Sequence, residues 1–363
     1  MCRTDPLIIG GGPAGAAAAI HLLCAGAQPT IIERQKETGD ALCGGFLSWR
    51  TLERLERLGI SSKMLGGHDV TVLRLFISGR SYEIPLPGTA ICLSRKRLDS
   101  LLLGEAQRLG AKLRQGVAAQ SHGPEGLRLD NGDLLQAESL FLATGKHDLR
   151  GLQRPRAAAG ADPMLGLRLK LPPAPDLRTK LSGYIEMHFI PGGYLGLVLH
   201  ETGETNACMA VRKSRLREAG GDPAAFFQRL ADSSPALADR LAGMSSATPV
   251  DAIGHIPYGW RARQGEPGIF RLGDQAGVIA SFAGEGIGLA LASAECAASH
   301  WKHGGGAAAL VYQKAFARQL RTPMRVAQGI ASWSARPEFA KIPAALFSAY
   351  PALAGIWAKA SRI

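Results

Sequence analysis

The stretch of sequence that decides the fold is residues 6–33, which read PLIIGGGPAGAAAAIHLLCAGAQPTIIE. It begins with a short apolar run that ends at Gly10, as in a buried strand. An alanine-rich segment with high helix propensity follows, and Gly26 ends it. Residues 30–33 form a second short apolar run. This order of strand, helix and strand predicts a parallel sheet that is covered by helices.

The loop between the first strand and the helix has the spacing G-x-G-x-x-G. Gly10 permits a tight turn, Gly12 lets the backbone approach a pyrophosphate, and Gly15 lets the helix pack closely against the strand. Glu33 lies 18 residues beyond Gly15, close to the roughly 20 residues expected for the acid that binds ribose hydroxyls. These features predict a dinucleotide site whose residues are Gly10, Gly12, Pro13, Ala14, Gly15 and Glu33.

The second strand ends in an acid followed by a base. Glu33 favours a ribose without a 2′-phosphate, as in FAD or NAD. The neighbouring Arg34 is expected to stack on the adenine or to face the phosphates.

A second glycine-rich loop lies near the other end of the chain. Residues 271–277 read RLGDQAG after a short apolar run, and residues 282–288 read FAGEGIG and open an expected helix. Asp274 stands at a strand end, where its carboxylate can accept hydrogen bonds from a polyol chain. We therefore expect the two glycine-rich loops to hold two halves of one cofactor.

Composition and charge exclude several classes of function. The chain has 363 residues and a formal net charge of +12, but no long Lys/Arg run that would indicate nucleic-acid binding. Six cysteines without a C-x-x-C pair suit neither zinc nor an iron–sulfur cluster, so we expect no metal, reduced thiols and a cytoplasmic protein. The basic balance favours an anionic partner: a carrier-bound acid, or an anionic membrane face that the protein touches peripherally.

Several segments together carry a resemblance to a known family. GGGPAG at 10–15, RKRLD at 95–99, ATG at 143–145 and GD…GEG at 273–286 occur in the order found in FAD-dependent oxidoreductases of the p-hydroxybenzoate hydroxylase superfamily. CGG at 43–45 and GGYLG at 192–196 resemble the geranylgeranyl-reductase-like branch. The resemblance covers residues 6–330. One departure is Ser281, where the family usually has proline.

The resemblance implies roles for individual residues. Arg95 would contact FAD from the start of its helix, and Asp274 would bind the ribityl or pyrophosphate part. Backbone N–H groups of the 284–287 segment would lie near the flavin pyrimidine edge, where donors stabilise the reduced flavin. The implied cofactor-binding residues beyond the first loop are Glu33, Arg34, Cys43, Gly44, Arg95, Gly273, Asp274, Gly284, Gly286 and Ile287.

Two side chains are candidates for chemistry beyond the flavin. Cys43 would lie on the substrate side of the flavin and assist protonation, although a small buried thiol is the alternative. Tyr194 would line the substrate pocket, although a tyrosine that only packs in the sheet is equally compatible with the pattern.

The fold implied is α/β, α+β overall: a Rossmann-type FAD-binding domain with an inserted antiparallel-sheet substrate domain and C-terminal helices. The FAD-binding domain is assigned to residues 1–67, 89–150 and 268–305, the substrate-binding domain to 68–88 and 151–267, and a helical region to 306–363. That region carries Trp333 and Trp357 and is expected to cap the substrate pocket or touch a membrane.

Three functions remain open from the sequence. The first is a flavoenzyme that reduces or dehydrogenates carbon–carbon bonds in an apolar or amphiphilic small molecule, free or carrier-bound. The second is an aromatic monooxygenase that uses NAD(P)H and O2. The third is an electron-transfer flavoprotein without its own substrate. With a single full G-x-G-x-x-G motif assigned to FAD, NAD(P)H as electron donor would bind only transiently.

Overall fold

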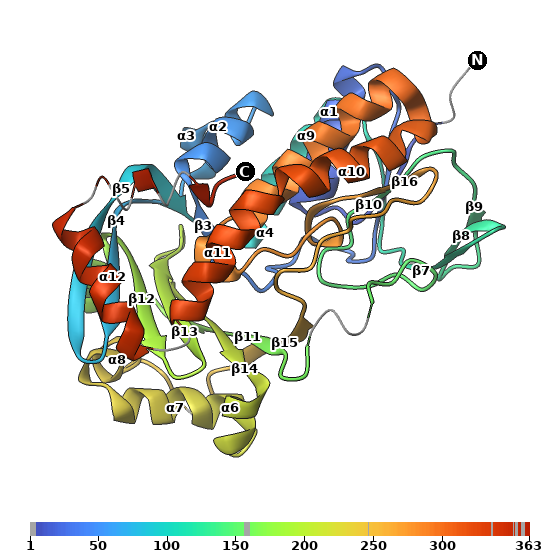
Figure 1. Ribbon diagram of the computed structural model, residues 1–363. Helices are drawn as coiled ribbons and strands as arrows, with labels where there is room; N and C mark the ends of the chain where they lie inside the picture. The colour runs from blue at the N-terminus through green and yellow to red at the C-terminus, as the bar shows by residue number, and fades with distance from the viewer. Residues whose placement is uncertain are drawn as a thin grey trace.

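Figure 1 shows the protein as a computed structural model, which describes residues 5–155, 160–245, 247–334, 337–350, 352, 355–356 and 360–363, without the side chains of 330, 333–334 and 337–339. The expected roles of Trp333 and Trp357 therefore lie outside the described part. Both ribbon views show two parts side by side. One part consists of helices and a parallel sheet, and the other is built on a large second sheet.

The parallel sheet has five strands in the order β16-β10-β1-β2-β6. All four neighbouring pairs within it run parallel. Its strands are β1 (Leu7–Ile9), β2 (Thr30–Glu33), β6 (Lys112–Gln115), β10 (Leu140–Leu142) and β16 (Ile269–Arg271). The two glycine-rich loops, about 260 residues apart in the sequence, therefore meet at the carboxyl end of one sheet.

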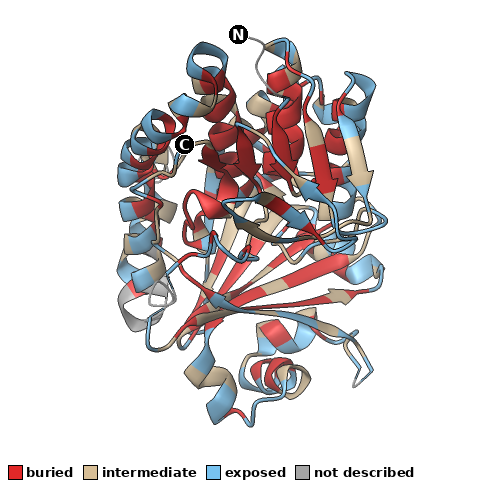
Figure 2. Ribbon diagram, turned by 90° about the vertical axis from the view of Figure 1, so that its right-hand side faces the viewer, coloured by how far each residue is buried: buried red, intermediate tan, exposed pale blue. Residues whose placement is uncertain are grey.

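Helices cover one face of this sheet. Alternate strand residues point to opposite sides, so every second residue of each strand faces these helices. Ile8, Ile31 and Phe141 pack with the helices in one core. These helices are α1 (Pro13–Cys24), α2 (Trp49–Arg57), α4 (Arg95–Arg108), α9 (Gly286–Gly304) and α10 (Ala309–Gln319). Figure 2 shows this layer as the most deeply buried part of the molecule.

A small antiparallel sheet covers the opposite face. Its strands are β7 (Ala119–Gly123), β8 (Gly126–Leu129) and β9 (Leu134–Leu135). Leu127 and Leu129 of β8 pack against Leu7 and Ile9 in a separate core. The parallel sheet is thus buried on both sides, which explains why its strands read as continuous apolar runs.

The second large sheet has eight strands in the order β15-β11-β14-β13-β12-β4-β5-β3. The strands are β3 (Phe46–Leu47), β4 (His68–Ile77), β5 (Arg80–Cys92), β11 (Met164–Leu171), β12 (Gly183–Ile190), β13 (Gly193–Leu199), β14 (Thr205–Arg212) and β15 (Val250–Ile256).

This sheet departs from the sequence-based expectation in two ways. Strand β12 pairs with β4 in parallel, because a crossover from a distant segment brings the two together, whereas the other pairs of the sheet are antiparallel. Residues 46–47 and 89–92 also belong to this sheet, although the sequence assigned them to the FAD-binding part. The two parts therefore share a sheet edge and are not joined by linkers alone.

Helices bury one face of the eight-stranded sheet, and the other face turns to the glycine-rich loops. The covering helices are α5 (Pro175–Leu181), α7 (Pro223–Ser233) and α8 (Pro235–Arg240), whose leucines and phenylalanines pack on strands β11, β13 and β14. Two short helices lie at other points, α3 (Ser62–Leu65) and α6 (Lys213–Glu218).

The C-terminal helices run from the first layer to the second sheet (Figure 1). They are α11 (Arg321–Ser334) and α12 (Pro337–Ala349). Ala344 and Phe347 of α12 pack with Met187 of β12, Tyr194 of β13 and Phe282 of the loop before α9. The helical region therefore closes one side of the space between the two layers.

Candidate cofactor and substrate site

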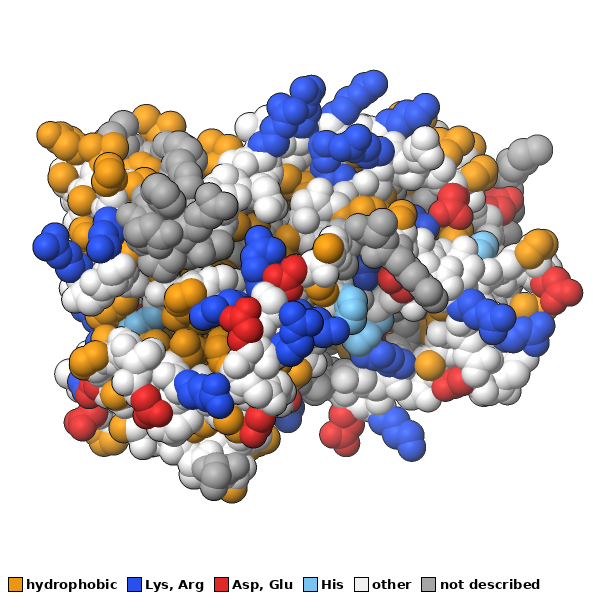
Figure 3. Space-filling view, turned by 60° about the horizontal axis from the view of Figure 1, so that its bottom comes forward, with side chains coloured by type: hydrophobic (Ala, Val, Ile, Leu, Met, Phe, Trp, Pro, Cys, Tyr) orange, Lys and Arg blue, Asp and Glu red, His pale blue; other side chains and the backbone are white. Residues whose placement is uncertain are grey.

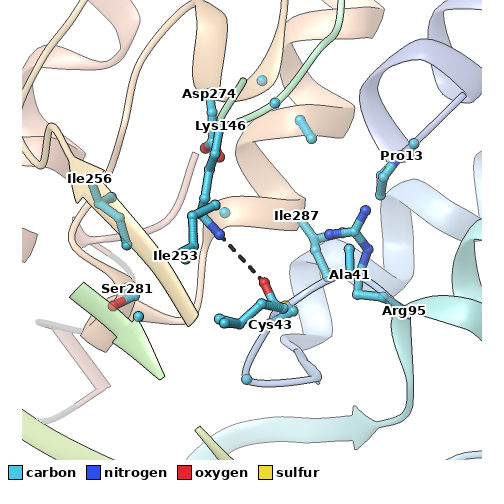
Figure 4. Close-up of a pocket in the computed structure, with 18 of the residues that line it drawn as sticks. Pro13, Ala41, Cys43, Arg95, Lys146, Ile253, Ile256, Asp274, Ser281 and Ile287 are labelled. Carbon is cyan, nitrogen blue, oxygen red and sulfur yellow. Dashed lines mark hydrogen bonds between the residues drawn. The ribbon is translucent and has the colours of Figure 1, made fainter. Parts of the chain in front are cut away.

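A cavity of about 760 Å³ lies between the carboxyl ends of the parallel strands and the open face of the second sheet. Every residue that the sequence assigned to the cofactor or to chemistry lines this cavity, except Gly15, which packs behind the first loop. In Figure 4, Pro13 and Arg95 stand at one end and Ser281, Ile253 and Ile256 at the other. The fold therefore joins a glycine-rich end and an apolar end in one space.

Close backbone packing fixes the first glycine-rich loop. A Cβ on Gly15 would stand 1.9 Å from the carbonyl oxygen of Gly10, and one on Gly10 would stand 2.5 Å from that of Ala143. Gly12 differs, because its Cβ would meet nothing closer than Arg95 Nη2 at 3.4 Å. Gly12 is also the N-cap residue of α1, and no side chain accepts a hydrogen bond from the first turn of this helix. The first N–H groups of α1 therefore remain available to phosphate oxygens.

Glu33 lies at the end of β2, beside the first loop. Its Oε2 accepts a hydrogen bond of 2.7 Å from the Gly11 N–H, and its Oε1 accepts one of 2.9 Å from Gln35. Each carboxylate oxygen keeps a further lone pair. Glu33 is thus held in place while it can still accept two hydroxyl groups. Arg34 also lines the cavity.

Arg95 stands at the first turn of α4 and forms two parallel hydrogen bonds to Asp99, from Nε at 2.8 Å and from Nη2 at 2.7 Å. Burial raises the pKa of Asp99, and the charge of Arg95 opposes that rise. Burial works against the charge on Arg95, but Asp99 outweighs it and raises the pKa of the guanidinium. Arg95 stays cationic, and its remaining N–H groups face the cavity beside Gly12.

The second loop approaches from the opposite side. Gly273 and Asp274 follow β16 in a short 3-10 helix, and Gly273 N–H donates to Ser293 Oγ at 2.9 Å. Gly284 has φ +66°, and a Cβ there would stand 2.8 Å from the Phe46 ring, so only glycine fits without a shift. Gly286 begins α9, and Ile287 follows it in the cavity wall.

The second sheet holds the loop that carries Cys43. Asn206 Nδ2 donates to the carbonyl oxygens of Cys43 and Gly44, at 3.0 and 3.1 Å. Gly45 has φ +74°, and a Cβ there would stand 2.5 Å from His200 Nε2. The Cys43 Sγ accepts a weak bond of 3.5 Å from the Gly45 N–H and faces the cavity. Cys43 therefore lies where the glycine-rich end meets the apolar end.

Tyr194 projects from β13 into the cavity. Its hydroxyl donates to Ser281 Oγ at 2.6 Å, and its ring meets Phe282 edge-on at 5.3 Å. Burial raises the pKa of Tyr194 well above its ordinary value, so the phenol stays protonated. Tyr194 thus both packs in the sheet and lines the pocket, which the sequence pattern had offered as alternatives.

Lys146, Arg168 and Tyr258 are among the cavity residues that the sequence did not single out. Lys146 Nζ donates to the Leu42 carbonyl at 3.4 Å across the cavity (Figure 4). Arg168 Nη2 donates to the carbonyl of Asp40 at 2.7 Å. A cation inside the apolar run MLGLRLKL was a signal for Arg168. Nothing local in the sequence marked Lys146 or Tyr258.

The residues present fit FAD. A turn of glycines at a free helix N-terminus suits a pyrophosphate, Glu33 suits a ribose, and the second loop offers Asp274 and backbone groups to the rest of the cofactor. Among the described residues, no three His, Cys, Asp or Glu side chains gather as metal ligands.

Comparison with known sequences identifies the cofactor. A family profile described as "FAD binding domain" matches residues 3–138. The chain is 31% identical to a menaquinone reductase of Mycolicibacterium smegmatis over 160 residues, which cover 41% of this chain and 39% of that protein. It is 25% identical to digeranylgeranylglycerophospholipid reductase 2 of Methanopyrus kandleri over 309 residues, 79% of this chain and 74% of that protein.

Solved structures share the fold. A geranylgeranyl bacteriochlorophyll reductase-like protein of Thermoplasma acidophilum matches with a TM-score of 0.72 and 18% identity, over 92% of this chain and 87% of that one. PqsL of Pseudomonas aeruginosa, described as a probable FAD-dependent monooxygenase, matches with a TM-score of 0.71 and 19% identity, over 94% and 99%. The chain is therefore an FAD-dependent oxidoreductase with an FAD binding domain over residues 3–138, and digeranylgeranylglycerophospholipid reductases are among the proteins it is similar to.

Proposed function

We propose that this flavoprotein reduces or dehydrogenates carbon–carbon double bonds of an apolar or amphiphilic substrate. The observation that carries the proposal is the apolar end of the cavity, which continues from the cofactor-binding end without a partition. Its lining comes from the second sheet and from the loop before α9: Leu73, Leu86, Ile185, Met187, Val198, Ile253, Ile256 and Phe282. A hydrocarbon chain gains about 25 cal/mol for each Å² that such a wall removes from water.

FAD, when bound, supplies the hydride transfer. In this proposal the glycine-rich loop and Arg95 bind the pyrophosphate, and Glu33 binds the ribose. Asp274 binds the polyol part. Arg168 keeps the 40–45 loop in place through the Asp40 carbonyl, so that Cys43 stays at the border between cofactor and substrate.

Cys43 is proposed as the group that moves a proton at its Sγ to or from the substrate carbon. Its loop is fixed by Asn206, and its thiol faces the cavity. Cys208, which also lines the cavity, is a weaker candidate because burial raises the pKa of its thiol to about 12. Tyr194 lines the same end and would orient the substrate.

An aromatic monooxygenase is the second candidate, favoured by the tyrosine and serine hydroxyls at the apolar end, which suit an oxygen-bearing ring. NAD(P)H is the proposed electron donor for either reaction. An electron-transfer role without a substrate accounts for neither the cavity nor its apolar wall.

The test is anaerobic. FAD-loaded protein reduced with NADH or NADPH is mixed with geranylgeraniol, and flavin absorbance and product mass are followed. Flavin reoxidation with a gain of two hydrogens in the product supports the proposal. Oxygen incorporation under air, without anaerobic reoxidation, assigns the monooxygenase reaction instead. Cys43→Ser should abolish turnover and keep FAD, whereas Cys24→Ser, at an exposed thiol, should change neither.

We also propose a peripheral membrane contact through α12. Ile342 and Leu346 on its outward face are 78% and 44% exposed, and Tyr350, directly after the helix, is 61% exposed, at a spacing that aligns them on one side. Figure 3 shows hydrophobic side chains gathered beside lysines and arginines at this end of the molecule. Among the described residues no helix is long and apolar enough to cross a bilayer.

The position of α12 relates this surface to the cavity. Its inward residues Ala344 and Phe347 pack beside Tyr194 and Phe282, which line or border the apolar end. A membrane on the outward face would therefore lie near the end of the cavity that takes the substrate, and the net charge of +12 favours anionic lipids. An amphiphilic substrate could then enter from the lipid.

A further inference from the structure

Three hydroxyl groups meet at the apolar end of the cavity. Tyr194, from β13, donates to Ser281 Oγ at 2.6 Å, and Tyr258, from the loop after β15, donates to the same oxygen at 2.7 Å. All three residues line the cavity, and Ser281 is exposed to it. We call Tyr194, Ser281 and Tyr258 the hydroxyl cluster.

The hydrogen-bond arithmetic leaves one donor in the cluster. A serine oxygen has two acceptor lone pairs and one hydrogen to donate. Both tyrosines are held protonated, because burial raises the pKa of each phenol. Both lone pairs of the Ser281 oxygen are therefore occupied. Its hydroxyl hydrogen is still free to donate, because no acceptor for it is found among the described residues.

Donation from both tyrosines also strengthens the remaining donor. Hydrogen bonds in a chain polarise one another, so an oxygen that accepts twice becomes a better O–H donor. From the sequence, Ser281 stood out only as a departure from the proline that the resembling family usually has there. The structure gives the serine two partners that a proline could not have.

The surroundings indicate the charge of the missing acceptor. Ile253 and Ile256 flank Ser281 in the cavity wall (Figure 4), and the Phe282 ring follows it in the chain. Within the described part of the chain, no lysine or arginine hydrogen-bonds to any member of the cluster. An anionic oxygen would be desolvated there without a counter-charge, whereas a neutral carbonyl oxygen needs only one donor.

We propose that Ser281 Oγ–H donates a hydrogen bond to a neutral carbonyl oxygen of the substrate, so that the hydroxyl cluster selects ketone- or quinone-bearing apolar molecules. This inference rests on the proposed function, since it concerns the substrate end of the same cavity. Ser281 is a specificity-determining residue in this account, and the two tyrosines are positioning residues that act through it.

The test measures binding of a matched pair of probes to FAD-loaded, oxidised protein. The pair is α-tetralone and tetralin, which differ by one carbonyl oxygen and do not react with thiols. Dissociation constants are read from the change in the flavin absorption spectrum. The wild-type protein should bind α-tetralone more tightly than tetralin. Ser281→Ala should weaken α-tetralone about tenfold, the size of one neutral hydrogen bond, and leave tetralin within about twofold.

Two further variants separate recognition from structure. Ser281→Thr keeps the hydroxyl and should therefore keep the preference for α-tetralone that the wild-type protein shows. Tyr258→Phe keeps the packing but removes one donor to Ser281, so it should reduce the preference less than Ser281→Ala does. FAD content, measured for every variant, shows that the loop before α9 is still in place.

One set of results overturns the inference. If the ratio of the two dissociation constants is the same in wild type and in Ser281→Ala at equal FAD content, or if wild type shows no preference, the cluster does not recognise a carbonyl. The proposed function fails separately, through the absence of anaerobic turnover of a carbon–carbon double bond. A protein that prefers the ketone but reduces no such bond would keep this inference and lose that proposal.

Discussion

Arg362 provides the sharpest stability prediction, because it neutralises a carboxylate inside the second glycine-rich loop. Glu285, which is 1% exposed, receives hydrogen bonds from Arg362 Nη1 and from Ser48 Oγ, the latter at 2.8 Å. Arg362 also donates to the Ala283 carbonyl at 2.6 Å and lies over the Trp49 ring at 4.8 Å. The contact ties the final residues of the chain to the loop that borders the flavin.

Replacing Arg362 with methionine keeps much of the packing and removes the charge. Breaking a buried pair on one side costs about 3–5 kcal/mol, since the other charge stays buried. Protonation of Glu285 limits that cost, because a neutral carboxyl group is cheaper to bury than an unpaired carboxylate. With m of about 3 kcal/mol/M in urea, the unfolding midpoint should fall by roughly 1 M.

The pH dependence follows from the direction of the shift. Burial already raises the pKa of Glu285 above its ordinary value of 4.5, and Arg362, with a smaller contribution from Arg54 on α2, opposes that rise. Without Arg362 the pKa in the folded protein rises further, so the folded state binds the proton more tightly than the unfolded state. Stability then falls as the pH rises above the unfolded pKa, and the deficit should be largest near about pH 8 and smallest near about pH 5.

The assay is urea unfolding of FAD-loaded protein at both pH values, with flavin release followed in parallel. Arg57→Met is the matched control, because that half-exposed side chain reaches Glu295 only at 3.8 Å. The double variant Arg362→Met with Glu285→Gln should recover most of the loss. An equal deficit at both pH values, or no recovery in the double variant, would refute the role assigned to this pair.

Three other outcomes are expected. Gly15→Ala should yield largely FAD-free protein, as measured by flavin absorbance. The new Cβ would stand 1.9 Å from a carbonyl oxygen, and such overpacking costs about 1–3 kcal/mol or more. A normal FAD content would contradict the close packing assigned to this loop. Glu33→Gln should weaken FAD binding about tenfold by calorimetry, the loss of one charge-assisted hydrogen bond, and an unchanged affinity would remove it from the ribose site. Leu346→Asp should reduce sedimentation with anionic vesicles, whereas Val311→Asp, at a side chain that is 61% exposed on α10, should not; equal effects would argue against α12 as the contact.

Local sequence was informative wherever one short segment carries its own physical constraint. The strand–glycine loop–helix unit needs Gly10, Gly12 and Gly15 for reasons that lie within a few residues, so its structure could be read directly. The fold class and the FAD cofactor followed from features of this kind.

Long-range pairing could not be read in the same way. Strand β12 lies beside β4 because of a crossover over a distant part of the chain, and no local pattern records that neighbour. Lys146 reaches the Leu42 carbonyl across the cavity, and Tyr258 reaches Ser281 from a loop 23 residues away. Such contacts depend on how two sheets face each other.

The sequence alone thus determined the cofactor end of this protein, since a pyrophosphate-binding turn is a local backbone geometry that glycines encode. Tertiary structure alone decided the substrate end. Its apolar wall and its hydroxyl cluster bring together side chains from segments far apart in the chain, and only the packing of the second sheet against the parallel sheet makes them neighbours. The Arg362–Glu285 pair at the second glycine-rich loop likewise depends on tertiary packing, because its two residues lie far apart in the sequence.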